Sequence, residues 1–136
     1  MAYVKEEWDI LLAQWLDGAR SREAALRLMF LSWYSCIEPP HLTGLEGVVP
    51  PEGLVDELFE FLGGEESHDA EFLFVVAVMA EVASWCLGDE QRWEGIAESF
   101  RARLGGDVPK PEGFLDRGEY GECFAHQARA QSNGAT

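Results

Sequence analysis

The stretch that most constrains the fold is an almost wholly apolar segment at residues 67–87, SHDAEFLFVVAVMAEVASWCL. Placed on a helix, its apolar side chains occupy nearly the whole circumference, whereas a surface helix has a single apolar stripe. Its uninterrupted apolar run, from Phe72 to Ala80, is nine residues long, against about 20 residues needed to cross a bilayer. The segment is therefore predicted to be a buried central helix, over about residues 68–87, that other helices cover on most sides.

The ends of this helix are marked by residues with strong terminal preferences. Ser67 can accept hydrogen bonds from the free N–H groups of the first turn, and Gly88 can end the helix. Glu81 is a carboxylate inside the apolar pattern, and we expect it to reach solvent at a narrow polar edge of the helix.

Five other segments show helical periodicity with an apolar stripe. They cover about residues 3–17, 22–36, 51–62, 90–104 and 118–130. The sequence therefore predicts an all-α fold, a compact bundle of five to six helices around the central one. We expect a single helical domain over residues 1–130, followed by a frayed tail at residues 131–136.

An internal resemblance links residues 45–56 to residues 104–116, which align after one insertion at Lys110. In both places the match follows two helical segments joined by a short turn that contains glycine. One interpretation is the duplication of a unit of about 60 residues, giving two similar helical halves. The alternative is that Pro followed by Glu is common chemistry for starting any helix.

The net charge of the chain bears on which classes of partner it can bind. The chain has 25 acidic and ten basic residues, for a net charge of −15, with an apolar fraction of 47% that indicates a folded protein. This balance argues against binding a nucleic-acid backbone and favours either a soluble surface or a basic partner. The start of the chain lacks the pattern of a signal peptide, which favours a cytoplasmic protein. The first hypothesis is an acidic cytoplasmic interaction module, such as an inhibitor, immunity factor or adaptor, that binds a basic protein.

The densest acidic stretch predicts where that partner would bind. Five carboxylates fall within 13 residues that contain no Lys or Arg; they are Glu57, Glu60, Glu65, Glu66 and Asp69. A face used only for solubility would mix acids with bases, whereas a docking face concentrates one sign. We expect charge reversal of Glu57, Glu60 and Glu65 to leave the fold intact and to abolish partner binding.

The second hypothesis is a small-ligand-binding or enzymatic helical domain with a pocket near residues 34–43. Its candidate residues are Tyr34, Glu38, His41 and Thr43. His41 could act as a base near neutral pH, although an exposed loop histidine is the plainer interpretation. No catalytic constellation appears in the sequence, and no cofactor is predicted.

Four side chains are of the types that bind zinc; they are Cys36, His41, Cys123 and His126. Their spacing is unlike that of the usual zinc sites, and Cys36 lies in an apolar pattern, so no metal site is predicted. Cys36 and Cys86 are instead interpreted as buried thiols.

The assembly state is left open between a monomer and a homodimer. The apolar stripe of the first helix consists of Val4, Trp8, Leu11 and Trp15. If the second helix cannot cover this stripe, the remainder would form a symmetric dimer contact.

Overall fold

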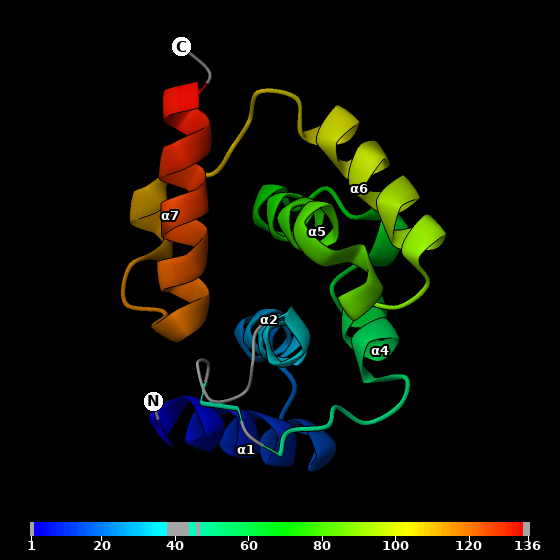
Figure 1. Cartoon of the computed structure of the whole chain (residues 1–136), viewed down its shortest axis with the longest axis vertical. Helices are drawn as coiled ribbons and strands as arrows, with labels where there is room; N and C mark the ends of the chain where they lie inside the picture. Colours follow the sequence, from blue (N-terminus) through cyan, green and yellow to red (C-terminus); the bar gives the residue numbers. More distant parts are fainter. Residues whose placement is uncertain (1, 38–43, 46, 135–136) are drawn as a thin grey trace. The chain divides into compact units, whose positions relative to one another are not determined.

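The computed structural model describes residues 2–37, 44–45 and 47–134 (Figure 1). Its α-helices are α1 (Ala2–Leu16), α2 (Arg22–Ile37), α4 (Leu54–Phe61), α5 (Ala70–Ala83), α6 (Glu90–Leu104) and α7 (Gly118–Gly134). Three short 3-10 helices are η1 (Gly64–Glu66), η2 (Ser84–Cys86) and η3 (Pro111–Phe114). The described residues contain no strand, so the prediction of an all-α fold with five to six helices is confirmed. Within those residues no helix is both long and apolar enough to cross a membrane.

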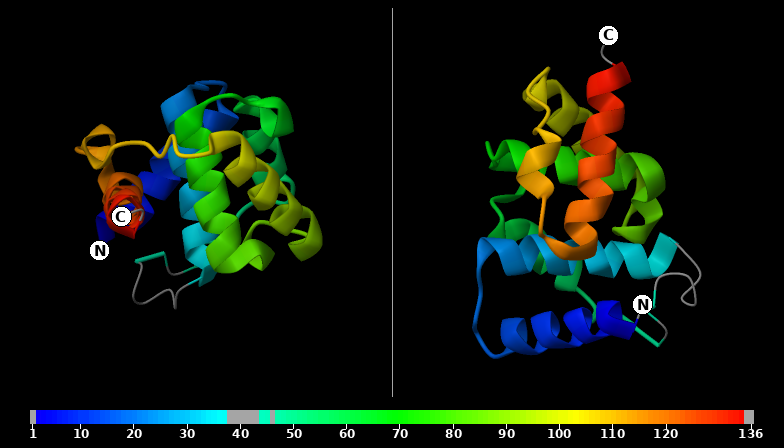
Figure 2. Two further views of the ribbon diagram at one scale, coloured as in Figure 1. Left: turned by 90° about the horizontal axis from the view of Figure 1, so that it is seen from above. Right: turned by 90° about the vertical axis from the view of Figure 1, so that its left-hand side faces the viewer.

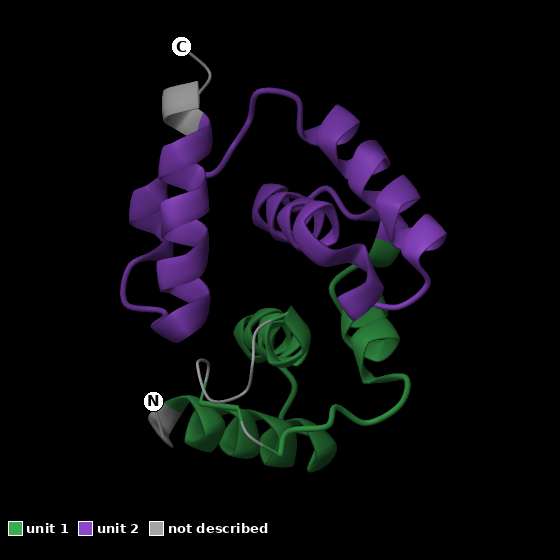
Figure 3. Ribbon diagram, in the orientation of Figure 1, with its two compact units in different colours: residues 1–64 green, residues 65–136 purple. Residues whose placement is uncertain are grey.

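The chain divides into two compact units, residues 1–64 and residues 65–136 (Figure 3). The first holds α1, α2 and α4, and the second holds α5, α6 and α7 with η3. Each unit is described by itself below. That residues 1–130 form one domain with a frayed tail stays a prediction.

In the first unit, α1 and α2 pack side by side, as the views of Figure 2 show, and α2 also packs on α4. The buried residues of α2 run almost without interruption from Ala24 to Trp33. On α1, the stripe residues Val4, Trp8 and Trp15 are buried. Leu11, the fourth residue of the stripe, is half-buried, and Ile10 and Leu16 of the same helix are exposed, so the choice between a monomer and a homodimer stays a prediction.

In the second unit, the apolar run from Phe72 to Ala80 is buried at every position, as the sequence predicts. The ends of the helix differ from the prediction. Asp69, not Ser67, caps α5, because its carboxylate accepts from the Phe72 N–H at 3.2 Å. Ser67 lies before the helix, and its Oγ accepts from the Asp69 N–H at 3.1 Å.

The C-terminal end of α5 also falls earlier than predicted. Ala83 adopts φ −157° and ψ 77°, which ends the α-helical hydrogen bonding, and the chain continues as the short helix η2. Val82, in the last turn of α5, and Trp85, in η2, are exposed by 52% and 62%. The prediction that apolar side chains would be covered around almost the whole helix is therefore wrong for these two.

Helix α6 matches its predicted range and packs along α5. Asp89 caps it by accepting from the Arg92 N–H at 2.8 Å, and Gly105 follows its last residue. Its buried stripe consists of Trp93, Ile96, Ala97, Phe100 and Leu104. A capping carboxylate, a clean stripe and a terminal glycine agree here, so local signals were enough to place both ends.

The cysteines differ from the sequence interpretation. Cys36, at the end of α2, is exposed, and Cys86, the last residue of η2, is half-buried. Both are disulfide-bonded. The interpretation of these two residues as buried thiols is therefore wrong.

Helix α7 and η3 pack closely against each other, as Figure 2 shows. A Cβ atom built on Gly121 of α7 would lie 2.2 Å from the carbonyl oxygen of Phe114 in η3. The rings of Phe114, Tyr120 and Phe124 cluster around this contact, with centroids 5.1 to 6.2 Å apart. Only glycine allows the two backbones to come this close.

We predict that Gly121→Ala destabilises the protein by about 2 kcal/mol, because the added methyl group meets backbone rather than a flexible side chain. Gly95→Ala in α6 is the matched control, since nothing lies within 4 Å of a Cβ atom at this helical position. The control should stabilise the protein by about 0.5 to 1 kcal/mol. Urea unfolding followed by circular dichroism would measure both, and a Gly121→Ala protein as stable as the parent would contradict the close contact.

The two units are alike in some of the features that the predicted duplication would produce, and they differ in others. Each unit contains three α-helices among its described residues, and each aligned Pro-Glu-Gly segment precedes the last of the three. The segments themselves differ, because Gly53 has φ 81° next to α4, whereas Gly113 lies inside η3 and has no positive φ. Duplication stays a prediction.

Candidate functional site

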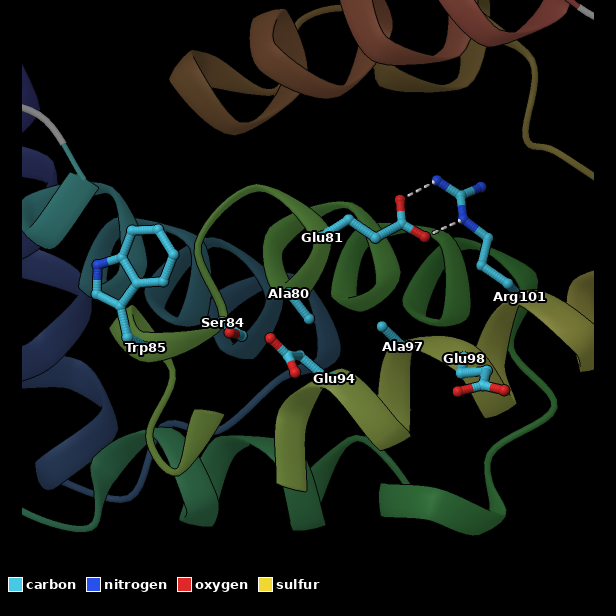
Figure 4. Close-up of a pocket in the computed structure, with 8 residues that line it drawn as sticks. All are labelled: Ala80, Glu81, Ser84, Trp85, Glu94, Ala97, Glu98 and Arg101. Carbon is cyan, nitrogen blue, oxygen red and sulfur yellow. Dashed lines mark hydrogen bonds and ion pairs between the residues drawn. The ribbon is translucent and has the colours of Figure 1, made fainter. Parts of the chain in front are cut away.

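A groove of about 440 Å³ lies between α6 and the end of α5 with η2, all within the second unit (Figure 4). We call it the α5–α6 groove. It is lined by Ala80, Glu81, Ser84, Trp85, Glu94, Ala97, Glu98 and Arg101. The buried alanines, Ala80 and Ala97, form an apolar floor, and the charged residues stand at the sides. In Figure 4, Trp85 lies at one end of the groove and the Glu81–Arg101 pair at the other.

Among the described lining residues of the groove, Arg101 is the one basic side chain, and it is already paired. Arg101 donates from Nε and Nη2 to the two carboxylate oxygens of Glu81, at 2.8 Å each. Its Nη1 donates to the side-chain oxygen of Gln131 in α7, also at 2.8 Å. Glu81 is exposed, as predicted for a carboxylate at a polar edge of α5. Arg101 is therefore paired with Glu81, and none of the three described hydrogen bonds of its guanidinium group goes to Glu94 or Glu98.

The remaining acids of the groove come from one exposed row of α6. Glu90, Glu94 and Glu98 recur every four residues and share one face of the helix. Within the described part of the chain, Glu94 and Glu98 have no ion-pair partner. These two carboxylates give the groove a negative field that nothing in the second unit is seen to neutralise.

Two further side chains that line the groove, Ser84 and Trp85, are available to a bound molecule. The Ser84 hydroxyl lines the groove, and no hydrogen bond to it is found among the described residues. Although the residue as a whole is only 3% exposed, its hydroxyl is not one of the buried polar atoms without a partner, so it faces the groove and is available to a bound molecule. Trp85 is 62% exposed, although large aromatic side chains dominate protein cores. The groove thus combines an open indole, a free hydroxyl and two uncompensated carboxylates.

A second hollow, of about 510 Å³, lies between η3 and α7. Its charged lining residues carry both signs; they are Asp116, Arg117, Glu122 and Arg129. Arg117 is already bound to the Glu71 carboxylate at 2.7 Å and to the Gly113 carbonyl oxygen at 3.0 Å. This hollow therefore shows less preference for one class of ligand than the α5–α6 groove.

The five predicted partner-binding acids belong to both units, Glu57 and Glu60 to the first and Glu65, Glu66 and Asp69 to the second. Glu57 has a structural role, because it accepts from the Trp15 Nε1–H at 2.9 Å and pairs with Arg20 at 3.0 Å. Asp69 has one too, as the cap of α5.

The other three predicted acids, Glu60, Glu65 and Glu66, are exposed. They are the part of the predicted set that remains available as a binding surface. Reversing the charge of Glu57 would put a cation beside Arg20 and remove the Trp15 acceptor. The expectation that charge reversal of Glu57, Glu60 and Glu65 leaves the fold intact therefore no longer holds for Glu57.

The alternative ligand pocket falls mostly outside the described residues, since Glu38, His41 and Thr43 all lie there. Its fourth residue, Tyr34, is half-buried and stacks on Phe30 with ring centroids 4.9 Å apart. This pocket stays a prediction.

The described residues do not bring together the four side chains of zinc-binding type, Cys36, His41, Cys123 and His126. His41 lies outside them, and Cys36 is disulfide-bonded, which removes its thiolate. Burial, with a smaller contribution from the neighbouring Glu119 carboxylate, raises the pKa of the Cys123 thiol to about 11. A thiol that stays protonated at neutral pH is a poor metal ligand and a poor nucleophile. In the described part of the chain, no group of three His, Cys, Asp or Glu side chains could hold a metal ion.

Comparison with known proteins gives no further assignment: no family model, no curated protein and no solved structure matches this chain.

Proposed function

We propose that the protein is an acidic interaction module that binds a basic protein partner through the α5–α6 groove. The observation that carries the proposal is the charge of the groove, where Glu94 and Glu98 have no cation and Arg101 is already used by Glu81 and Gln131. A groove with an apolar floor and one sign of charge at its sides favours an extended cationic segment over a neutral ligand. An inhibitor, an immunity factor or an adaptor would each use such a surface.

The same function could use the acids Glu60, Glu65 and Glu66, which the sequence predicted as part of the binding face. The groove is favoured because it offers shape and apolar contact as well as charge. The cytoplasmic location also stays a prediction, and it gains no support from Cys36 and Cys86, because disulfide-bonded cysteines are typical of oxidising compartments.

The test is calorimetric titration with a peptide of eight residues that alternates lysine and glycine, at low and at high salt. We predict binding that weakens strongly as salt rises, because screening shortens the reach of the charges. In the variant that combines Glu94→Gln with Glu98→Gln, the dissociation constant should rise by about threefold to tenfold, since each exposed charge pair contributes modestly.

The matched control combines Glu65→Gln with Glu66→Gln, which removes the same charge from exposed positions of the same unit. It should raise the dissociation constant less than twofold by the general loss of charge alone. If the control pair raised the dissociation constant more than the Glu94 and Glu98 pair does, the partner would bind at η1 and not in the groove. Binding whose affinity does not depend on salt would overturn the proposed function.

A further inference from the structure

We infer that the α5–α6 groove receives an arginine side chain of the basic partner, stacked on the Trp85 indole, with its guanidinium group bound by Glu94, which lies between Trp85 and Glu98 in Figure 4. This inference rests on the proposed function and names the residue type that the groove selects. Three features of the molecule support it.

The first is an arrangement that the chain already uses in its first unit. There the guanidinium carbon of Arg20 lies 4.5 Å from the ring centroid of Trp15, which is within cation–π distance. The same guanidinium group pairs with the Glu57 carboxylate at 3.0 Å. An indole face, an arginine and a carboxylate thus form one closed set of contacts.

The second is that the α5–α6 groove holds the same groups without the arginine. Trp85 presents an indole that is 62% exposed, and Glu94 and Glu98 present carboxylates from the facing helix. Arg101 does not supply the missing cation, because its guanidinium group is held by Glu81 and Gln131. An arginine from another molecule would complete the set that Arg20 completes in the first unit.

The third is the floor of the groove. Ala80 and Ala97 have short side chains, so they leave room for the three methylene groups of an arginine stem and cover them with apolar surface. The Ser84 hydroxyl can accept from a guanidinium N–H or donate to a backbone carbonyl oxygen of the partner. Either bond would give this hydroxyl a hydrogen-bond partner that it lacks among the described residues.

Arginine fits these features better than lysine does. Its planar guanidinium group stacks on an aromatic ring and still directs its edge donors to carboxylates, whereas an ammonium group is compact and strongly hydrated. Without the stacking surface, the main reason for the groove to prefer arginine over lysine is lost.

The experiment compares two eight-residue peptides that alternate glycine with arginine or with lysine, titrated into the full chain by calorimetry. We expect the arginine peptide to bind about fivefold to tenfold more tightly than the lysine peptide, from the value of a cation–π stack. In Trp85→Ala this preference should disappear, while the affinity for the lysine peptide changes by less than about twofold. The indole Nε1–H resonance of Trp85, assigned by its absence from Trp85→Phe, should shift only when the arginine peptide binds.

Val82→Ala is the matched control, since Val82 is an exposed apolar residue of α5 that does not line the groove. It should keep the preference for arginine. The arginine inference would be overturned by equal affinities for the two peptides, or by a preference for arginine that survives Trp85→Ala. The proposed function would still stand in that case if Glu94→Gln with Glu98→Gln weakened the binding of both peptides. If neither peptide bound in a salt-dependent way, the proposed function itself would fall.

Discussion

Replacing Val78 by aspartate is expected to prevent the chain from folding at 25 °C. Val78 lies in the middle of α5 and is 3% exposed, with buried residues on both sides of it in the sequence. A carboxylate placed there loses its hydration and has no cation to pair with, which costs more than about 4 kcal/mol. Natural domains are stable by only about 5 to 15 kcal/mol, so for a protein near the lower end of that range this loss leaves little or no folded protein. Circular dichroism and a urea titration would measure it.

The control is the same substitution four residues later. Val82 lies on the same helix but is 52% exposed, so Val82→Asp should change the free energy of unfolding by no more than about 0.5 kcal/mol. The pair separates the effect of burial from the effect of an aspartate in a helix. If Val78→Asp melted like the parent protein, the run from Phe72 to Ala80 would not be the core of the second unit.

Replacing Glu71 by alanine is expected to destabilise the protein by about 3 kcal/mol, near the lower end of the range for breaking a buried ion pair. The Glu71 carboxylate accepts from Arg117 Nη2 at 2.7 Å and from the Tyr120 hydroxyl. The side chains of Glu71 and Arg117 are only 17% and 16% exposed, and Tyr120 is 1% exposed. Alanine would therefore remove the carboxylate that balances a poorly hydrated cation and that accepts from a buried hydroxyl.

Two variants check this explanation by urea unfolding. Glu71→Gln keeps an oxygen for Tyr120 but loses the charge, so its loss of stability should be smaller than that of Glu71→Ala. Asp9→Ala breaks the pair with Lys5, in which the two side chains are 58% and 46% exposed; its effect should be below about 0.5 kcal/mol. An equally small effect of Glu71→Ala would show that the three side chains do not depend on one another.

Local sequence signals placed the helices well where several of them agreed. At α6 the capping Asp89, the apolar stripe and Gly105 all indicate the same bounds, and the structure has those bounds. At the start of α5, Ser67 and Asp69 are both good caps two residues apart, so residue preference alone could not choose between them. The end of α5 at Ala83 carries no glycine or proline, and it depends on a backbone geometry that has no sequence signal.

The candidate site was harder to predict than the helices. The sequence drew attention to acids that are close along the chain, from Glu57 to Asp69, although two of those five side chains have structural partners. The α5–α6 groove instead joins residues 80–85 to residues 94–101, and only the packing of the two helices brings them together. The one local signal was the row of Glu90, Glu94 and Glu98, whose like charges repel along a helix without benefit to its stability.

The contact between Gly121 and the Phe114 carbonyl oxygen bears on how relatives of this protein could be found. Neighbouring surface positions such as Leu115 and Glu122 are exposed, so they can exchange freely as sequences diverge. Position 121 cannot, because every residue except glycine brings a Cβ atom into the backbone of η3. A distant descendant should therefore keep a glycine seven residues after the aromatic residue of η3, long after the acids of its surface have changed.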